Sequence, residues 1–222
     1  MNSSRSTEIM LALCRPNPRL EETAALFAAV TREGLGAELF QLADTHRVLG
    51  LILHQLAALD LIGKWEGAGD LLSAYREQSK WSVVLELECE RILTILSQAG
   101  VRPVLLKGAA LRRVIYAAPV QRPMSDLDLL IADEDFDAAA SSLSRAGFQL
   151  PRKDIQDAYR RYHFHLQAQH SRSFMVELHW ALSRPGDVVQ LDPQGMRAST
   201  EARFRWPGPG FLTSLAPLPT PQ

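Results

Sequence analysis

The segment Arg122-Pro123-Met124-Ser125-Asp126-Leu127-Asp128-Leu129-Leu130-Ile131 decides how the rest of this chain is interpreted. From residue 126 onward, acidic and apolar residues alternate, which predicts a strand over residues 127–131. Successive side chains of a strand point to opposite faces, so Asp126 and Asp128 share one face and the apolar residues share the other. We therefore expect the apolar face to pack on a core and the acidic face to meet water or a cation.

Two carboxylates held this close repel each other, and a hard divalent ion relieves that repulsion. Mg²⁺ (or Mn²⁺) suits a site built on Asp126 and Asp128, because it takes a few carboxylates and keeps positions for phosphate oxygens and water. Asp-x-Asp alone is also compatible with a solvated acidic edge that binds nothing. The remaining motifs must separate these two interpretations.

A third acid, Glu177, lies in the second alternating run Val176-Glu177-Leu178-His179-Trp180. Glu177 and His179 share one face of that predicted strand. On its own Glu177 is compatible with an exposed strand residue. If its strand lies beside the strand of Asp126 and Asp128, three carboxylates converge, which is what a two-metal phosphoryl- or nucleotidyl-transfer site requires.

The third motif is the turn Leu105-Leu106-Lys107-Gly108-Ala109-Ala110. A short apolar strand is predicted over residues 101–106 and a helix over residues 109–116. The free N–H groups at the start of a helix favour phosphate, although a simple tight turn gives the same pattern. No Walker A motif, GxxxxGK[ST], occurs in the chain.

These three motifs, in this order, resemble the uncharacterised nucleotidyltransferase family of the polymerase-β-like superfamily. Its members carry an LKG turn, an R-x-x-x-D-x-D-x-L-[VI] strand and a later E-L-H-W, and the resemblance is closest over residues 101–182. The resemblance implies that Asp126, Asp128 and Glu177 bind the metal ions, with Glu177 also a candidate base toward the acceptor hydroxyl. It implies that Gly108, with the turn around it, faces the nucleotide phosphates.

The resemblance also supplies candidates for the remaining nucleotide contacts. They are Lys107, Ala109, Arg122 and Ser125. Lys107 is equally compatible with a salt bridge to an acid. Ala109 departs from the superfamily, in which many members have serine after the glycine, so one hydroxyl that would hold phosphate is missing.

The function implied is a metal-dependent transfer of a nucleoside monophosphate, AMP from ATP as the first choice among NTPs, to a hydroxyl of a small molecule or a protein. Because of Ala109, a non-catalytic nucleotide-binding or regulatory partner module (antitoxin-like) remains the alternative. His163, His165 and His179 are candidates for an acceptor pocket. His179 is also compatible with a purely structural role as a buried, hydrogen-bonded histidine.

The predicted fold class is α+β, with a helical N-terminal region followed by a small mixed β-sheet nucleotidyltransferase core flanked by helices. Apolar residues at spacings of three and four predict the first helices, and Gly100 and Gly147, each before an apolar residue, predict the ends of two later ones. Tyr162–Ala168 and Phe174–Trp180 predict a hairpin. The helices are expected over residues 20–30, 37–61, 70–96 and 134–146.

Three regions are therefore expected: residues 1–100 (helical), 101–182 (nucleotidyltransferase α/β core) and 183–222 (C-terminal extension). Five prolines after Trp206 predict an irregular tail. Family members continue here with further helices, so we expect a shortened C-terminus.

Composition and charge limit the classes of partner that this chain can be expected to bind. The chain has 222 residues and a formal net charge of −1, which argues against extensive nucleic-acid binding. The most apolar stretch, residues 48–62, is shorter than a membrane span and predicts a buried or amphipathic helix. No export signal is visible and the two cysteines form no CxxC pair, so we expect a cytoplasmic protein with no membrane partner.

Overall fold

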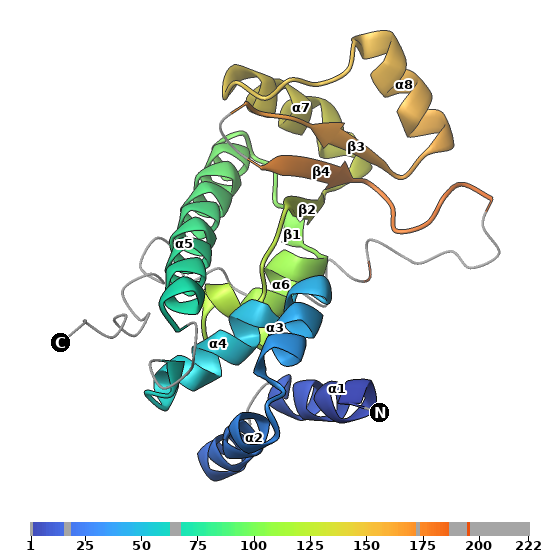
Figure 1. The fold of residues 1–222 in the computed structure, drawn as a ribbon. Helices are drawn as coiled ribbons and strands as arrows, with labels where there is room; N and C mark the ends of the chain where they lie inside the picture. Colours follow the sequence, from blue (N-terminus) through green and yellow to red (C-terminus); the bar gives the residue numbers. More distant parts are fainter. Residues whose placement is uncertain (1, 16–18, 63–67, 172–173, 187–194, 196–222) are drawn as a thin grey trace. The chain divides into compact units, whose positions relative to one another are not determined.

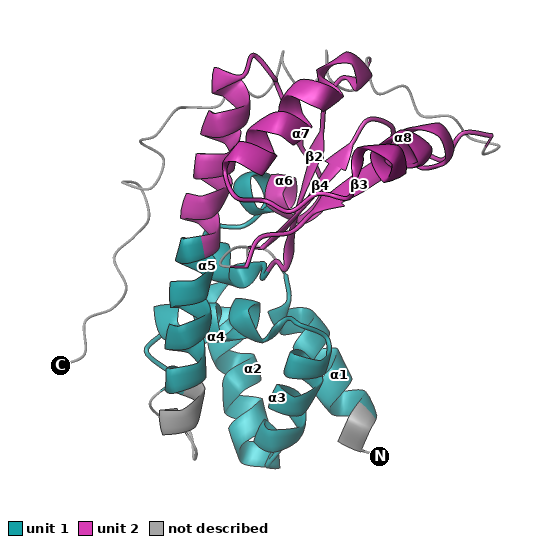
Figure 2. Cartoon of the chain, turned by 90° about the horizontal axis from the view of Figure 1, so that it is seen from above, with its two compact units in different colours: residues 1–84, 112–123, 216–222 teal, residues 85–111, 124–215 magenta. Residues whose placement is uncertain are grey.

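The structure of this chain is a computed structural model that describes residues 2–15, 19–62, 68–171, 174–186 and 195. Within these residues it has eight α-helices and one four-stranded mixed sheet, so the predicted α+β fold is confirmed (Figure 1). The chain divides into two compact units (Figure 2). Residues 1–84 and 112–123 belong to the first, here called the helical unit, and residues 85–111 and 124–215 to the second, the sheet unit. The division predicted at residues 100 and 182 stays a prediction.

The helical unit contains more helices than the sequence predicted. Its elements are α1 (Asn2–Leu13), α2 (Leu20–Glu33), α3 (Gly36–Thr45), α4 (Leu49–Ala58), the first part of α5 (Ala68–Gln98) and the 3₁₀ turn η2 (Pro119–Gln121). The single helix predicted over residues 37–61 is wrong, because the chain breaks between α3 and α4. At that break Arg47 has a φ of 56°, and the Val48 N–H donates to the Ala43 carbonyl at 2.8 Å, the pattern of a left-handed helix end.

Helix α4 is the apolar stretch that predicted a buried helix, and most of its side chains are buried. It packs against η2 at Gly50, where an added Cβ would lie 2.2 Å from the carbonyl oxygen of Val120. Arg112 also holds η2 in place, because its Nε and Nη2 donate to the Pro119 carbonyl at 3.1 and 2.8 Å. Gly50 is therefore required by close approach of two backbones.

In the sheet unit, four short strands form the sheet in the order β1-β2-β4-β3. They are β1 (Val104–Leu105), β2 (Asp126–Leu130), β3 (His165–Ala168) and β4 (Met175–His179). β2 pairs with β4 in parallel, and the other two pairs are antiparallel. The hairpin predicted from the two alternating runs is confirmed as β3 and β4. β1 is shorter than the strand predicted over residues 101–106, where Pro103 has no N–H to give to a ladder.

One face of the sheet lies on the core of this unit. Leu127, Leu129 and Ile131 are fully buried, as the alternation predicted. The second part of α5 and α7 (Phe136–Arg145) supply the partners on that face. Those helix residues include Leu85, Cys89, Ile92, Leu96, Phe136, Ala139 and Leu143. The opposite face carries the polar side chains of β2 and β4, next to a small apolar cluster of Val104, Leu106 and Leu130.

The two predicted glycine stops are confirmed. Gly100 and Gly147 have φ values of 79° and 94°. The N–H groups of Val101 and Phe148 each donate at 3.0 Å to a carbonyl five residues earlier, as in the Schellman motif.

Helix α8 (Lys153–Tyr162) was missed by the sequence analysis, which placed a strand over residues 162–168. Ile155, Tyr159 and Tyr162 are spaced by four and three, a helical period. All three are exposed, so α8 is held by ion pairs such as Arg160 with Asp133 at 2.8 Å rather than by a buried stripe.

Two predictions concern the rest of the chain. The irregular tail after Trp206 lies outside the described residues. Among the helices that the structure describes, none combines the length and the apolar character needed to cross a bilayer.

Replacing Gly50 by alanine tests the packing of α4 on η2. Alanine normally stabilises a helix by about 1 kcal/mol relative to glycine. Here we expect Gly50→Ala to lower the free energy of unfolding by about 1–3 kcal/mol, because the new methyl group meets a backbone oxygen that cannot move aside easily. Urea unfolding measures the change. Ala58→Gly, at the exposed end of the same helix, is the control for propensity alone, and a Gly50→Ala protein as stable as the wild type would contradict the close approach.

Candidate active site

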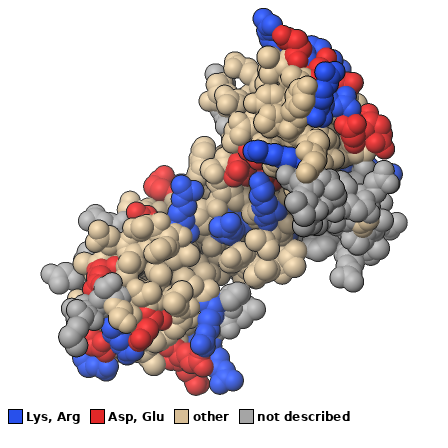
Figure 3. Space-filling view, turned by 90° about the vertical axis from the view of Figure 1, so that its right-hand side faces the viewer, with Lys and Arg blue, Asp and Glu red and all other residues tan. Residues whose placement is uncertain are grey.

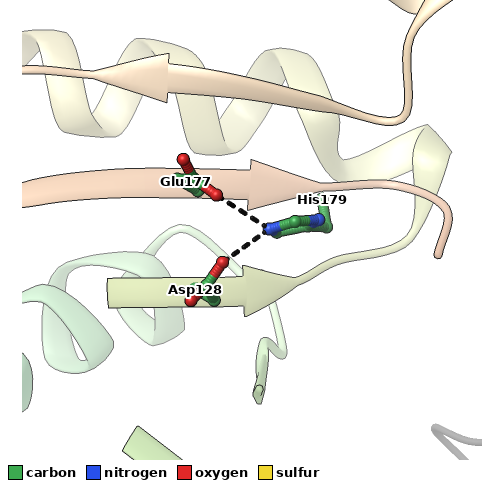
Figure 4. Close-up of side chains that lie close together, drawn as sticks. All are labelled: Asp128, Glu177 and His179. Atoms are coloured by element: carbon green, nitrogen blue, oxygen red, sulfur yellow. Dashed lines mark hydrogen bonds and ion pairs between the residues drawn. The ribbon is translucent and has the colours of Figure 1, made fainter. Parts of the chain in front are cut away.

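The pairing of β2 with β4 brings three polar side chains together on the face away from the core. Asp128 lies opposite Glu177, and Leu130 lies opposite His179. Figure 4 shows Asp128 on β2 and both other residues on β4, with the His179 ring between the two carboxylates. His179 Nε2 lies 2.9 Å from Asp128 Oδ1 and 3.5 Å from Glu177 Oε2. All three residues are buried, and one potential ligand atom from each lies within 4.8 Å of the others.

Asp126 lies two residues before Asp128 on the same face of β2, but it does not belong to this group of three. It is half-buried, and its Oδ1 accepts a hydrogen bond from the Ser125 hydroxyl at 3.2 Å. The sequence motifs predicted that Asp126, Asp128 and Glu177 lie together. The structure brings His179 into contact with the last two and leaves Asp126 at the more exposed start of the strand.

Lys107 is the cationic partner of these acids. Its Nζ donates to Asp128 Oδ1 at 2.5 Å and lies 3.6 Å from Glu177 Oε2. Burial lowers the pKa of Lys107, but the hydrogen bond to Asp128 and the charges of Asp128, Glu177 and Asp126 outweigh burial and raise it. Of the two roles that the sequence left open, phosphate contact or salt bridge, the described contacts are those of the salt bridge.

The LKG turn has its unusual backbone at the lysine rather than at the glycine. Lys107, the first residue of α6 (Lys107–Val114), has a φ of 44°. An added Cβ at Gly108 would lie 3.3 Å from the Met124 side chain. Ala109 is buried in the core of the sheet unit, so its methyl group packs inward and the turn can offer a ligand only its backbone N–H there.

The neighbouring strand β3 extends the polar face. Gln167 lies opposite Glu177 and donates to its Oε1 at 2.9 Å. The His165 ring stacks on the His179 ring with centroids 5.0 Å apart. Burial lowers the pKa of His165, with Glu177 opposing that shift. Gln167 was missed by the sequence analysis, although it lies two residues after His165 and therefore shares its face of the predicted strand.

A cavity of about 520 Å³ opens along β3 and α8. His163 and His165 line it, together with Tyr159, Gln167 and Arg184. His179, the third histidine predicted for an acceptor pocket, lies in the acidic group instead. The structure thus brings two of the three histidines to one cavity, and Gln167 touches both that cavity and Glu177.

Arg122 and Ser125 frame the start of β2. Arg122 follows η2 and belongs to the helical unit, whereas Ser125 belongs to the sheet unit and is exposed. Their assignment to phosphate or acceptor contacts stays a prediction.

The electrostatics of Asp128 suit a cation. Burial alone would raise its pKa, but hydrogen bonds from His179 and Lys107 outweigh burial and lower the pKa to about 2. Asp128 is therefore ionised at neutral pH although its side chain is only 5% exposed. Two carboxylates and one imidazole within reach of one another form a donor set that fits a divalent cation.

The low pKa of Asp128 predicts a pH-dependent share of stability. A carboxyl group whose pKa is lower in the folded state contributes stability above its unfolded value of roughly 3.9, and that contribution is lost as the pH falls through the folded value. We expect the difference in free energy of unfolding between wild type and Asp128→Asn to shrink by about 1–2 kcal/mol from pH 5 to pH 2.

Chemical denaturation at several pH values measures this difference. Asp157→Asn is the control, because it removes an exposed carboxylate from α8 whose ion pair with Lys153 is worth little. If the difference in free energy of unfolding between the wild type and Asp128→Asn stayed constant from pH 5 to pH 2, the lowered pKa of Asp128 would be contradicted.

Comparison with known proteins identifies the family of this chain. A family model described as "Uncharacterised nucleotidyltransferase" matches residues 36–217, which include Lys107, Asp126, Asp128, Glu177 and His179. A search of curated proteins and a search of solved structures each found no match. Because the family model covers most of the 222 residues, the chain belongs to this nucleotidyltransferase family.

Proposed function

We propose that this chain transfers a nucleoside monophosphate, AMP from ATP as the first choice, to a hydroxyl group of a small molecule or a protein, with Mg²⁺ or Mn²⁺ as cofactor. The observation that carries the proposal is the opposition of Asp128 and Glu177 on two parallel strands, in a chain of a nucleotidyltransferase family. We expect the protein to act in the cytoplasm.

In this proposal Asp126, Asp128 and Glu177 hold the divalent cation. A cation bound there would polarise phosphate oxygens and help a hydroxyl lose its proton. Glu177 accepts that proton, and the hydroxyl oxygen forms a bond to the α-phosphorus. The bond from the α-phosphorus to the bridging oxygen breaks, and pyrophosphate leaves. Backbone N–H groups at the start of α6 hold the phosphates.

The acceptor would enter through the cavity on β3. Gln167 supports this direction, because it lines the cavity and donates to Glu177, the proposed base. His163 and His165 would contact the acceptor there, while His179 orients Asp128 through its hydrogen bond. Figure 3 shows Lys and Arg side chains mixed with Asp and Glu towards both ends of the face that it draws, and several Lys and Arg side chains with few acids in its middle. The formal net charge of −1 favours a small molecule or a protein over a polynucleotide as acceptor.

Two observations favour a second candidate, a non-catalytic regulatory module. Ala109 carries no hydroxyl for phosphate, and its methyl group is buried. Lys107 already neutralises part of the acidic group. Such a module would form a stable complex with a partner without turning over a nucleotide.

Incubation with α-labelled ATP and Mg²⁺ tests transfer directly. We expect release of pyrophosphate and a mass increase of one nucleotide on an acceptor, found by screening hydroxyl compounds and co-purified proteins by mass spectrometry. Asp128→Asn and Glu177→Gln should each lower the rate by about 100-fold or more, because each removes a charged ligand of the cation and Glu177→Gln also removes the proposed base.

Asp157→Asn on α8 is the control and should transfer at the wild-type rate. Full transfer by the double variant Asp126→Asn, Asp128→Asn would refute the proposed site. A stable partner complex with no transfer by the wild type would favour the regulatory module.

A further inference from the structure

The ammonium group of Lys107 occupies the position in which the proposed metal site would hold a cation. This group contacts Asp128 and Glu177, the two buried carboxylates of the proposed metal site, and it interacts electrostatically with Asp126. A divalent cation on the same oxygens and an ammonium group 2.5 Å from Asp128 Oδ1 would repel each other strongly. Lys107 and the metal therefore compete for one place.

The two sides of this ion pair differ in freedom. The side chains of Asp128 and Glu177 are 5% and 11% exposed, whereas the Lys107 side chain is 60% exposed. The ammonium group can leave the carboxylates without opening the core. The acids, held by His179 and Gln167, cannot follow it.

The backbone also places Lys107 at the start of α6, where the proposed function puts the nucleotide phosphates. Lys107 has a left-handed φ of 44° that residues with a Cβ seldom adopt, and it is the first residue of α6. The first N–H groups of a helix have no partner within the helix and favour phosphate. An ammonium group released from Asp128 therefore finds phosphate oxygens at the turn that carries it.

We propose that Lys107 is an exchangeable counter-ion: it neutralises Asp128 and Glu177 in the empty site and transfers its ion pair to the nucleotide phosphates when the metal–nucleotide complex binds. This inference rests on the proposed function. It makes the binding of metal and nucleotide cooperative, because a metal alone must displace Lys107 without giving it a new anion, whereas a metal bound with a triphosphate supplies one.

Lys107→Met removes the charge and keeps an unbranched side chain, and it should change two affinities in opposite directions. We expect Mn²⁺ alone, followed by electron paramagnetic resonance, to bind about fivefold or more tightly than to the wild type. We expect ATP, titrated by calorimetry in saturating Mn²⁺, to bind about tenfold more weakly. Lys153→Met removes an exposed lysine paired with Asp137 and should change neither affinity.

Lys107→Gly is the second variant. It also removes the charge, and glycine adopts the left-handed backbone freely, so the variant should fold and shift both affinities in the same directions. Unchanged or weaker Mn²⁺ binding by both variants overturns the counter-ion proposal, even if ATP binding weakens. The proposed function fails separately if Asp128→Asn binds Mn²⁺ and ATP as the wild type does, since neither would then use these acids.

Discussion

The parallel pairing of β2 with β4 is the constraint on which the proposed chemistry depends. In this register Asp128 faces Glu177 across two adjacent strands, and His179 lies one pleat further on the same face. A shift of one residue would send Glu177 and His179 into the core and Val176 and Leu178 to the polar face. The buried leucines and valine on the apolar face therefore fix the register, and the register fixes the acidic group.

Charge compensation is the second requirement of this arrangement. Buried carboxylates need partners, and here each has more than one: Lys107 and His179 contact both acids, and Gln167 donates to Glu177. The hydrogen bonds hold the pKa of Asp128 at about 2, so Asp128 keeps its negative charge at neutral pH. Such a site attracts cations. In this structure the ammonium group of Lys107 is the cation that contacts both acids.

Much of the sheet unit could be predicted from local patterns. Alternation in residues 126–131 predicted the two faces of β2, and Gly100 and Gly147 predicted two helix ends, because each of these features depends on a few neighbouring residues. The break at Arg47 and the left-handed backbone of Lys107 could not be predicted in this way, since long side chains usually avoid that region. Helix α8 was missed because its helical period rests on only Ile155, Tyr159 and Tyr162 among charged and polar residues, too short a pattern to stand out from a loop.

The separation of Asp126 from Asp128 shows the same limit at the site. Alternation predicts that both point to one face, which the strand confirms, but it does not predict how deep each lies. Depth depends on β4, β3 and Lys107, which are distant in sequence. For the same reason the salt bridge of Lys107 stayed one of two alternatives until the register of the strands was known.

Titration of ATP into the purified chain, with and without Mg²⁺, shows whether the acids of β2 and β4 form a nucleotide site. We expect calorimetric binding that requires Mg²⁺ and is lost in the double variant Asp126→Asn, Asp128→Asn while the variant stays folded. Absence of nucleotide binding by a well-folded wild-type protein, or equal binding by the double variant, would contradict a nucleotide site at these acids.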